Sequence, residues 1–526
     1  MNKLVNRAFL IVIIAFFLPV FQNTCLLYGQ NDGVIDKDKE NYTIKMASAW
    51  LKVLDEDYYG ALRIYRTIFA VNPEDAMLNF RMGQCFVEIK EMDTALVHLK
   101  RSLQNDSLIN TDVYLALGQA YQYLTDIDNA IENYYRFKVT LSPKKNDRHV
   151  VNTYMRECYT AKDLIANPVN VQIKNLGEGI NSIFTDANPS ITADGQTMVF
   201  TSRRPDNTGG NIDPYVEEYY DDIYISTWDA GSKVWTKAVN IGSPVNSDGH
   251  DANMSISPDG KELFTYKNLM GETRSGDIYI CEKKPTGEWG EPKAIINKYV
   301  NTTYFESSAC LSGDGKTLYF VSEREREGFG HGDIYYSIKD GKEWTKPVNL
   351  GPVINTEGDE IGVFIHPDGK SLFFSSNGHN TMGGYDIFMS VFENERWSEP
   401  INMGYPINTT RDEIHLVFST DRKTAYISSS REGGKGKMDI YQVNMAYYFK
   451  NNQNISSDIA STITGPPLSI LKGTVVDGET SQPIEANIII KDLSDNKTKI
   501  TSSNENGEYF ITIPADVKYE ITIKNK

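Results

Sequence analysis

The feature that most constrains this chain is an internal repeat in its middle. Four copies contain an Asp-Gly turn, the fifth keeps only the aspartate, and each continues 18 to 28 residues later with an Asp-Ile-Tyr or Asp-Ile-Phe strand. Four strands a copy at a period of 53 to 56 residues are typical of β-propeller blades, with Asp-Gly forming a tight hairpin turn. The repeat predicts a five-bladed β-propeller over residues 168–445. The aspartates that begin the repeated strands are Asp222, Asp277, Asp333, Asp386 and Asp439.

The fifth copy lacks the strand that completes the other blades. A matching strand stands before the first copy, where Val169–Gly177 ends in Asn-Leu-Gly, as later blades end in Asn-Ile-Gly, Asn-Leu-Gly or Asn-Met-Gly. We expect this strand to complete the fifth blade, because a closed ring leaves no sheet edges exposed.

A second repeat covers residues 40–166. Small residues recur at intervals of 34 to 35, for example Gly83 and Gly118, or Ala95 and Ala130, with larger apolar residues between them. Small residues let two antiparallel helices approach closely. The segment resembles the tetratricopeptide repeat, in about three copies. That resemblance implies an α-helical solenoid whose groove binds a protein or peptide, and a plain spacer is the alternative.

A polar linker over residues 446–468 leads to a C-terminal segment, residues 469–526. Alternating strands joined by Gly, Pro and Asn turns indicate a β-sandwich there. The pattern resembles the carboxypeptidase regulatory-like module, which carries no peptidase chemistry. About five strands fit where such sandwiches have about seven. The predicted fold class is therefore multidomain α and β: a helical solenoid, a five-bladed propeller and a partial sandwich, with the chain ending at Lys526 inside its last domain.

The N-terminus predicts export. Lys3 and Arg7 precede an apolar run over residues 8–21, which is short for a membrane span and typical of a signal peptide over residues 1–29. Lipid attachment at Cys25 is an alternative end for this segment, although the residues before it match such a site poorly.

Charge and cysteine content narrow the functional classes. With 70 acidic and 53 basic residues the net charge is -17, which argues against nucleic acid as a partner. Four cysteines follow the leader without Cys-x-x-Cys spacing, so neither a metal knuckle nor a redox pair is indicated. Buried thiols are expected, and a disulfide between Cys281 and Cys310 is the alternative.

One position is acidic in every blade, just before the innermost strand. Propeller geometry predicts that these side chains ring one mouth of the central channel, where they would hold a cation or a basic peptide. The alternative is that each carboxylate caps an adjacent loop. The residues are Asp186, Asp251, Glu306, Glu360 and Glu413.

The first blade departs from the repeat. Its interval between the Asp-Gly turn and the Asp-Ile-Tyr strand is 28 residues against 18 or 19 elsewhere, and the excess forms a loop over residues 205–220. Tyr215, Tyr219 and Tyr220 make this acidic loop suited to contact with a partner, and a loop without functional consequence is the alternative.

No catalytic set emerges from the sequence. Seven histidines are scattered, and neither Gly-x-Ser-x-Gly nor His-Glu-x-x-His is present. We therefore expect no catalytic residues, no metal, no cofactor and no enzymatic activity.

The propeller repeats resemble the TolB-like, WD-type family. The order of leader, tetratricopeptide repeats, propeller and regulatory-like module resembles Bacteroidetes envelope proteins of the OmpA family, some of which are accessory to type IX secretion. The peptidoglycan-binding OmpA domain is absent, which puts peptidoglycan binding in doubt. The resemblance implies a non-enzymatic scaffold in the periplasm, associated with the outer membrane, that binds envelope or secretion proteins through the repeat groove and propeller faces. The alternative is a propeller that binds a glycan or small ligand in nutrient capture.

Overall fold

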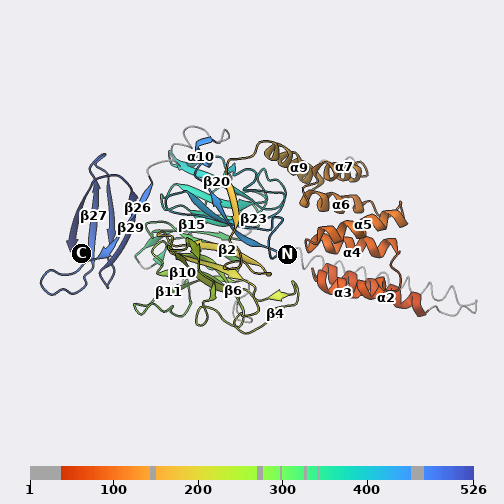
Figure 1. The fold of residues 1–526 in the computed structure, drawn as a ribbon, viewed down its shortest axis with the longest axis horizontal. Helices are drawn as coiled ribbons and strands as arrows, with labels where there is room; N and C mark the ends of the chain where they lie inside the picture. The colour runs from red at the N-terminus through yellow and green to blue at the C-terminus, as the bar shows by residue number, and fades with distance from the viewer. Residues whose placement is uncertain are drawn as a thin grey trace, which may run out of the picture.

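The computed structural model describes residues 37–142, 150–268, 276–295, 299–324, 328–341, 343–451 and 467–525. A layer of helices, a ring of five sheets and a small two-sheet unit follow one another along the long axis of the molecule (Figure 1). The predicted signal peptide and Cys25 lie outside the described residues.

Paired antiparallel helices form the first layer. Gly83 and Gly118 permit this pairing, because a Cβ atom on them would lie 2.6 Å from Leu99 and 2.4 Å from Tyr134 respectively. Aspartate N-caps begin three of the helices by accepting a backbone N–H. The helices are α2 (Lys37–Leu54), α3 (Tyr58–Phe69), α4 (Ala76–Glu88), α5 (Met92–Asn105), α6 (Asp112–Tyr123), α7 (Ile127–Lys138) and α9 (Val151–Ala166).

The prediction of a tetratricopeptide solenoid is wrong, and with it the predicted fold class. Strands prevail in the described residues, and the seven short helices before the propeller form a single layer packed on it. Thr125 Oγ1 lies 2.9 Å from Thr410 Oγ1, and Met382 of the propeller belongs to the apolar core of α7 and α9. The 34-residue period indicates only that neighbouring helices pack in pairs, and every stack of helical hairpins has such pairs. It does not distinguish a free solenoid from a layer that another domain covers.

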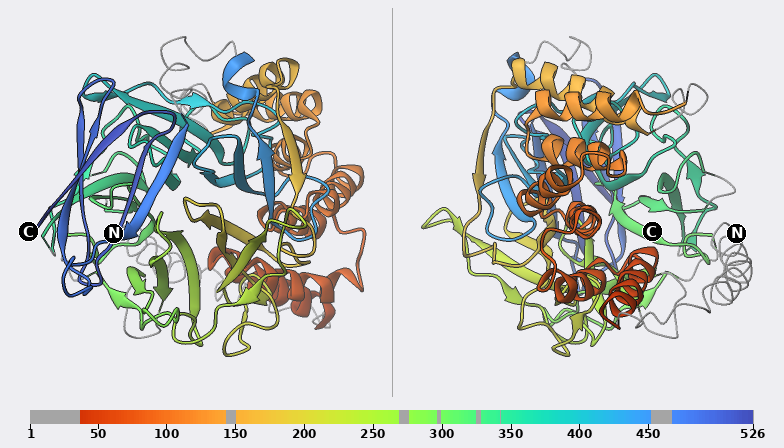
Figure 2. Two further views of the ribbon diagram at one scale, coloured as in Figure 1. Left: turned by 60° about the vertical axis from the view of Figure 1, so that its left-hand side comes forward. Right: turned by 90° about the vertical axis from the view of Figure 1, so that its right-hand side faces the viewer.

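Five antiparallel sheets surround one axis (Figure 2). Each begins with an inner strand that carries a β-bulge or similar register shift. The inner strands are β2 (Asp186–Ile191), β9 (His250–Ile256), β13 (Glu306–Leu311), β18 (Glu360–Ile365) and β23 (Glu413–Phe418). The second strands are β3 (Thr197–Ser202), β10 (Glu262–Asn268), β14 (Thr317–Ser322), β19 (Ser371–Ser376) and β24 (Thr424–Ser429). The third strands are β6 (Asp222–Asp229), β11 (Asp277–Glu282), β15 (Asp333–Asp340), β20 (Asp386–Glu393) and β25 (Asp439–Asn444).

Short outer strands complete the sheets. They are β7 (Val234–Trp235), β8 (Val239–Asn240), β12 (Lys293–Ala294), β16 (Glu343–Trp344), β17 (Val348–Asn349), β21 (Arg396–Trp397) and β22 (Ile401–Asn402). In the fifth sheet this place is taken by β1 (Gln172–Asn175), which pairs with β25. Ring closure by the strand before the first repeat is thereby confirmed.

The Asn-x-Gly signature has a structural role in closure. Asn175 Nδ2 donates to Asp439 at 2.6 Å, and Asn349 Nδ2 donates to Asp333 at 2.7 Å in the third sheet. The same bond forms in the first and fourth sheets, from Asn240 to Asp222 and from Asn402 to Asp386, whereas β12 of the second sheet has Ala294 at this position. The two recurrent residues are one hydrogen-bonded unit that fixes the outer strand in register.

A small sandwich covers the propeller face that carries the Asp-Gly turns (Figure 1). Its strands β26 (Leu468–Thr474) and β29 (Glu508–Pro514) face the propeller, and β28 (Thr498–Ser502), β27 (Ala486–Asp492) and β30 (Tyr519–Asn525) form a second sheet. Lys472 Nζ lies 3.2 Å from Asp194, and Thr512 Oγ1 donates to the Pro367 carbonyl at 3.2 Å. The helical layer and the sandwich therefore lie on opposite faces of the ring.

Two smaller elements complete the description. Helix α10 (Tyr448–Asn451) packs beside the fifth sheet, and strands β4 (Ile212–Asp213) and β5 (Glu218–Tyr219) form a hairpin in the first-blade insertion. Among the helices of the described segments, none has the length and apolar character that crossing a bilayer requires.

Candidate functional site

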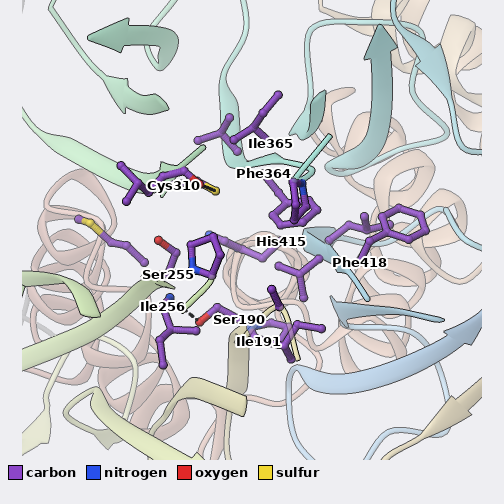
Figure 3. A pocket seen from close by; sticks show the side chains of 18 of the residues that line it. Ser190, Ile191, Ser255, Ile256, Cys310, Phe364, Ile365, His415 and Phe418 are labelled. Atoms are coloured by element: carbon purple, nitrogen blue, oxygen red, sulfur yellow. Dashed lines mark hydrogen bonds between the residues drawn. The ribbon is translucent and has the colours of Figure 1, made fainter. Parts of the chain in front are cut away.

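The central channel is too full for a ligand of sugar size. Inner strands of all five sheets converge on a cavity of about 40 Å³ (Figure 3). The polar or thiol groups there are Ser190, Ser255, Cys310, His415 and Thr420, and apolar side chains line most of the rest. A pocket for a small molecule typically holds about 300–1,000 Å³. A few water molecules are the largest occupant that this cavity admits.

The five predicted channel-mouth carboxylates are fully buried, each at 0% exposure. Each accepts the backbone N–H and the hydroxyl of the residue four positions earlier, as Glu306 does from Thr302 at 2.9 and 2.6 Å. Their oxygens are therefore used inside their own blades. This geometry favours the loop-capping alternative, and a cation or basic peptide at these residues stays a prediction. The set is Asp186, Asp251, Glu306, Glu360 and Glu413, capping Ser182, Ser247, Thr302, Thr356 and Thr409.

Four of these carboxylates have a cation in the same place of the blade. Each cation also donates to a loop carbonyl, as Arg431 does to the Ile407 carbonyl at 2.8 Å while lying 3.4 Å from Glu413. In the fourth blade His379 takes this place, and its Nε2 lies 2.8 Å from the Ile354 carbonyl. Glu360 has no cationic partner among the described residues, and burial raises its pKa to about 7. The other three pairs are Asp186 with Arg204, Asp251 with Lys267 and Glu306 with Arg324.

The cysteines are buried thiols. Cys281 and Cys310 are not bonded to each other, so the alternative of a disulfide between them is wrong. Burial raises the pKa of both thiols to about 11, which keeps them protonated and unreactive at neutral pH. In the residues that the structure describes, no group of three His, Cys, Asp or Glu side chains is placed to hold a metal ion.

A polar cluster that reaches solvent lies instead under the first-blade insertion, and we call it the rim site. Its residues come from three segments: the loop after β3, the region of the insertion hairpin β4–β5, and the start of β9. Its charged side chains are 9–23% exposed, in contrast to the five capping carboxylates. The rim site consists of Arg203, Asp213, Glu218, Tyr220, Asp221 and His250.

Asp221 is the centre of the rim site. Arg203 donates to both of its oxygens, Nε to Oδ1 at 2.7 Å and Nη2 to Oδ2 at 3.1 Å, and His250 Nδ1 lies 2.9 Å from the same Oδ2. His250 Nε2 points toward Asp213, 3.7 Å away. Burial alone would raise the pKa of Asp221, but the hydrogen bond with His250 and the charge of Arg203 lower it. The carboxylate is therefore ionised throughout the neutral range.

The predicted contact tyrosines occupy different places around the rim site. The Tyr220 ring lies over His250, with centroids 4.1 Å apart, and Tyr219 packs edge-on against Phe184. Tyr215 is 59% exposed and lies outside the cluster. Glu218 accepts a hydrogen bond from Thr185 at 2.9 Å. The role of the tyrosines in partner contact stays a prediction.

Sequence reasoning missed Arg203, Asp221 and His250. The long interval in the first blade marks the insertion, but nothing local in the sequence shows that His250, one blade later, folds against it. The repeat offers one usable signal, because the residue before the strand aspartate is Asp221 here and glycine, tyrosine or methionine in the other blades.

No family model matches the chain, and no curated protein matches it in sequence. Solved structures resemble it in part. An α-L-arabinofuranosidase from Podospora anserina is 14% identical, with 52% of this chain and 92% of that chain covered and a TM-score of 0.32. The periplasmic gluconolactonase of Pseudomonas aeruginosa is 11% identical, with 63% and 87% covered and a TM-score of 0.28. A β-xylosidase/α-arabinofuranosidase from a compost metagenome is 10% identical, with 53% and 94% covered and a TM-score of 0.35.

These findings correct the functional expectation. The neighbours named above are carbohydrate-active enzymes and a lactonase, and no family model supports tetratricopeptide repeats, an OmpA-family relationship or type IX secretion. The envelope-family resemblance, the non-enzymatic scaffold and the expectation of no enzymatic activity are therefore wrong. The functional prediction failed for a physical reason: repeat spacing and domain order indicate how the elements pack, whereas function depends on side chains at a site outside the repeated positions. Identities and TM-scores this low carry no activity over to this chain.

Proposed function

We propose that the protein binds a glycan or a related small sugar at the rim site. The carrying observation is the contrast in exposure: Asp213, Asp221 and His250 reach solvent, while the channel is filled and the capping carboxylates are buried. Sugars have hydroxyl groups that pair with carboxylates and guanidinium groups, and apolar ring faces that pack on tyrosine. The rim site offers all three groups on the edge of a rigid ring.

Charge narrows the ligand class. Asp213, Glu218 and Asp221 face Arg203, and Lys437 Nζ lies 3.8 Å from Glu218. Three carboxylates against two permanent cations leave a negative balance, which favours a neutral or amino sugar over an acidic one.

Titration calorimetry with neutral, amino and acidic oligosaccharides tests the proposal. Tyr220→Ala removes the aromatic face without touching an ion pair, and Asp221→Asn removes a charge that orients two neighbours. Each should weaken binding by roughly tenfold or more, since a hydrogen bond to a charged group contributes about 1.5–3 kcal/mol. Asp421→Asn, on the opposite face, is the matched control and should bind normally. Binding that survives both rim changes, or no binding by the parent protein, would contradict the proposal.

The His250–Asp221 pair favours hydrolysis as a second candidate function. In the tautomer that donates its Nδ1 proton to Asp221, Nε2 of His250 carries no proton and can accept one. Nε2 would take a proton from water as the water oxygen adds to an acyl carbon, such as that of a sugar lactone, and would return the proton to the leaving alkoxide. His250→Gln should then abolish turnover of a lactone substrate while sugar binding falls less than threefold, roughly. Equal turnover in parent and variant would exclude this role for His250.

A further inference from the structure

The last strand of the sandwich, β30, is an unpaired edge. Within the described residues it pairs only with β27, and it ends the sheet β28-β27-β30. The hydrogen bond and ion pair of Thr512 (β29) and Lys472 (β26) with the propeller come from the other sheet, and Lys499 of β28 also lies near propeller charges. Figure 1 places β27 on the far side of the sandwich from the propeller. In the part of the chain that the structure describes, no strand pairs with the outer edge of β30.

The inward face of β30 is apolar and uncovered. Ile521 lies opposite Ile490, and Ile523 lies opposite Ile488, so all four side chains share one face of the sheet. Ile488 and Ile490 are buried at 0% and 1%, whereas Ile521 and Ile523 are 46% and 52% exposed. The two-stranded sheet β26–β29 covers β27 but leaves β30 open.

The charges of β30 are arranged symmetrically about its middle residue. Glu520 and Lys524 stand at equal distances from Thr522, the centre of Tyr519–Asn525. When two identical strands pair antiparallel about Thr522, Glu520 of each copy lies opposite Lys524 of the other. Ile521 then lies opposite Ile523 of the other copy, on the uncovered face. A register centred on Ile521 instead places Lys518 opposite Lys524, where like charges repel.

We propose that β30 is the interface of a homodimer, in which two copies pair antiparallel about Thr522. The pairing joins two three-stranded sheets into one of six strands and gives both free edges hydrogen-bond partners. It also gathers four half-exposed isoleucines into one apolar patch. The occupant of this edge is therefore a second copy of the chain.

A charge exchange on the full chain tests the proposal by sedimentation equilibrium from about 1 μM to about 1 mM. The parent protein should dimerise in this range. Glu520→Lys alone and Lys524→Glu alone should each weaken the dimer about tenfold, because both symmetric pairs change from attractive to repulsive. An equimolar mixture of the two variants should regain parent affinity, since each hybrid dimer restores opposite charges. The double variant should regain it as well.

Two controls separate this interface from other causes. Ile521→Lys should abolish dimerisation, whereas Ile500→Lys, at an isoleucine 54% exposed on β28, should leave it unchanged. Circular dichroism of every variant should match the parent, which shows that the sandwich stays folded. A monomeric parent at all concentrations, or no recovery in the mixture of single variants, would overturn the proposal.

Discussion

At the scale of single residues, the five blades provide an internal comparison for buried charge. Four capping carboxylates have an arginine or lysine partner, and Glu360 has His379 in the equivalent place. The backbone caps are the same in all five. Burial raises the pKa of Glu360 to about 7, and it also raises the pKa of Asp186, Glu306 and Glu413, where an arginine partner offsets part of the effect.

A pH-dependent effect of Glu360→Gln follows from this comparison. A carboxyl whose folded pKa exceeds its unfolded value of about 4.3 holds a proton in the native state, so parent stability falls as pH rises toward 7. Because Gln does not titrate, Glu360→Gln should remove this pH dependence. The free energy of unfolding of the variant should be close to that of the parent at pH about 4 and higher than that of the parent at pH about 8. Urea unfolding at both pH values measures it. His379→Arg should have the same effect by supplying the cation, and identical pH slopes in all three proteins would contradict the argument.

Glu413→Gln is the matched comparison. The substitution leaves the largely buried Arg431 without its carboxylate partner. Removing one partner of a buried ion pair lowers the free energy of unfolding by about 3–5 kcal/mol. The loss should be smaller here, because Arg431 still donates to two backbone carbonyls. We expect a loss of about 2 kcal/mol at neutral pH, measured by the same unfolding experiment. If Glu413→Gln were no less stable than the parent at neutral pH, the cation would contribute nothing.

At the scale of elements, closure of the ring depends on four residues of β1. Lys174 and Gln442 are direct cross-strand partners in the pairing of β1 with β25, and neither is buried. Each of the other four propeller sheets is built from strands of a single repeat. The fifth sheet alone joins the two ends of the propeller, so it is the pairing with the largest loop to close.

A disulfide across this pair should stabilise the protein. Cross-strand neighbours have Cα atoms about 4.5–5.5 Å apart, within the range of a disulfide. Lys174→Cys with Gln442→Cys should raise stability by about 3–5 kcal/mol when oxidised, because it constrains almost the whole propeller in the unfolded state. A control disulfide from Thr317→Cys with Ile338→Cys, at two residues paired within one sheet, closes a far shorter loop and should raise stability by less. Thermal unfolding with and without reductant measures both, and equal gains would argue against the loop-length account.

At the scale of the whole molecule, both faces of the propeller are covered. The helical layer rests on one face through the turn between α6 and α7, and the sandwich lies on the other. Arg411 is the principal polar contact of the helical layer: its guanidinium lies 4.7 Å from the Tyr123 ring centroid and donates to the Tyr123 and Ser430 carbonyls. The apolar core around α9 includes Met382 and Tyr405 of the propeller.

Arg411→Ala should therefore uncouple the layers. Loss of the cation–π contact and of the single hydrogen bond to the Tyr123 carbonyl removes about 2 kcal/mol of coupling, so one calorimetric transition should separate into two. Arg396→Ala, at an exposed arginine of the outer strand β21, is the control and should leave a single transition. An unchanged profile for Arg411→Ala would show that the apolar contacts and the remaining hydrogen bonds, such as that from Thr160 to Asn380, hold the layers together without it.

The amino-acid sequence by itself determined the ring of five sheets and its closure, because turns, strand aspartates and Asn-x-Gly signatures are local and recur at a fixed period. It also located the insertion of the first blade. Only the tertiary structure decided that the helices form a layer on the propeller, that the recurrent carboxylates are buried caps, and that Arg203, Asp221 and His250 meet. Those outcomes depend on packing between segments far apart in the chain, and periodicity carries no information about which distant surfaces come into contact.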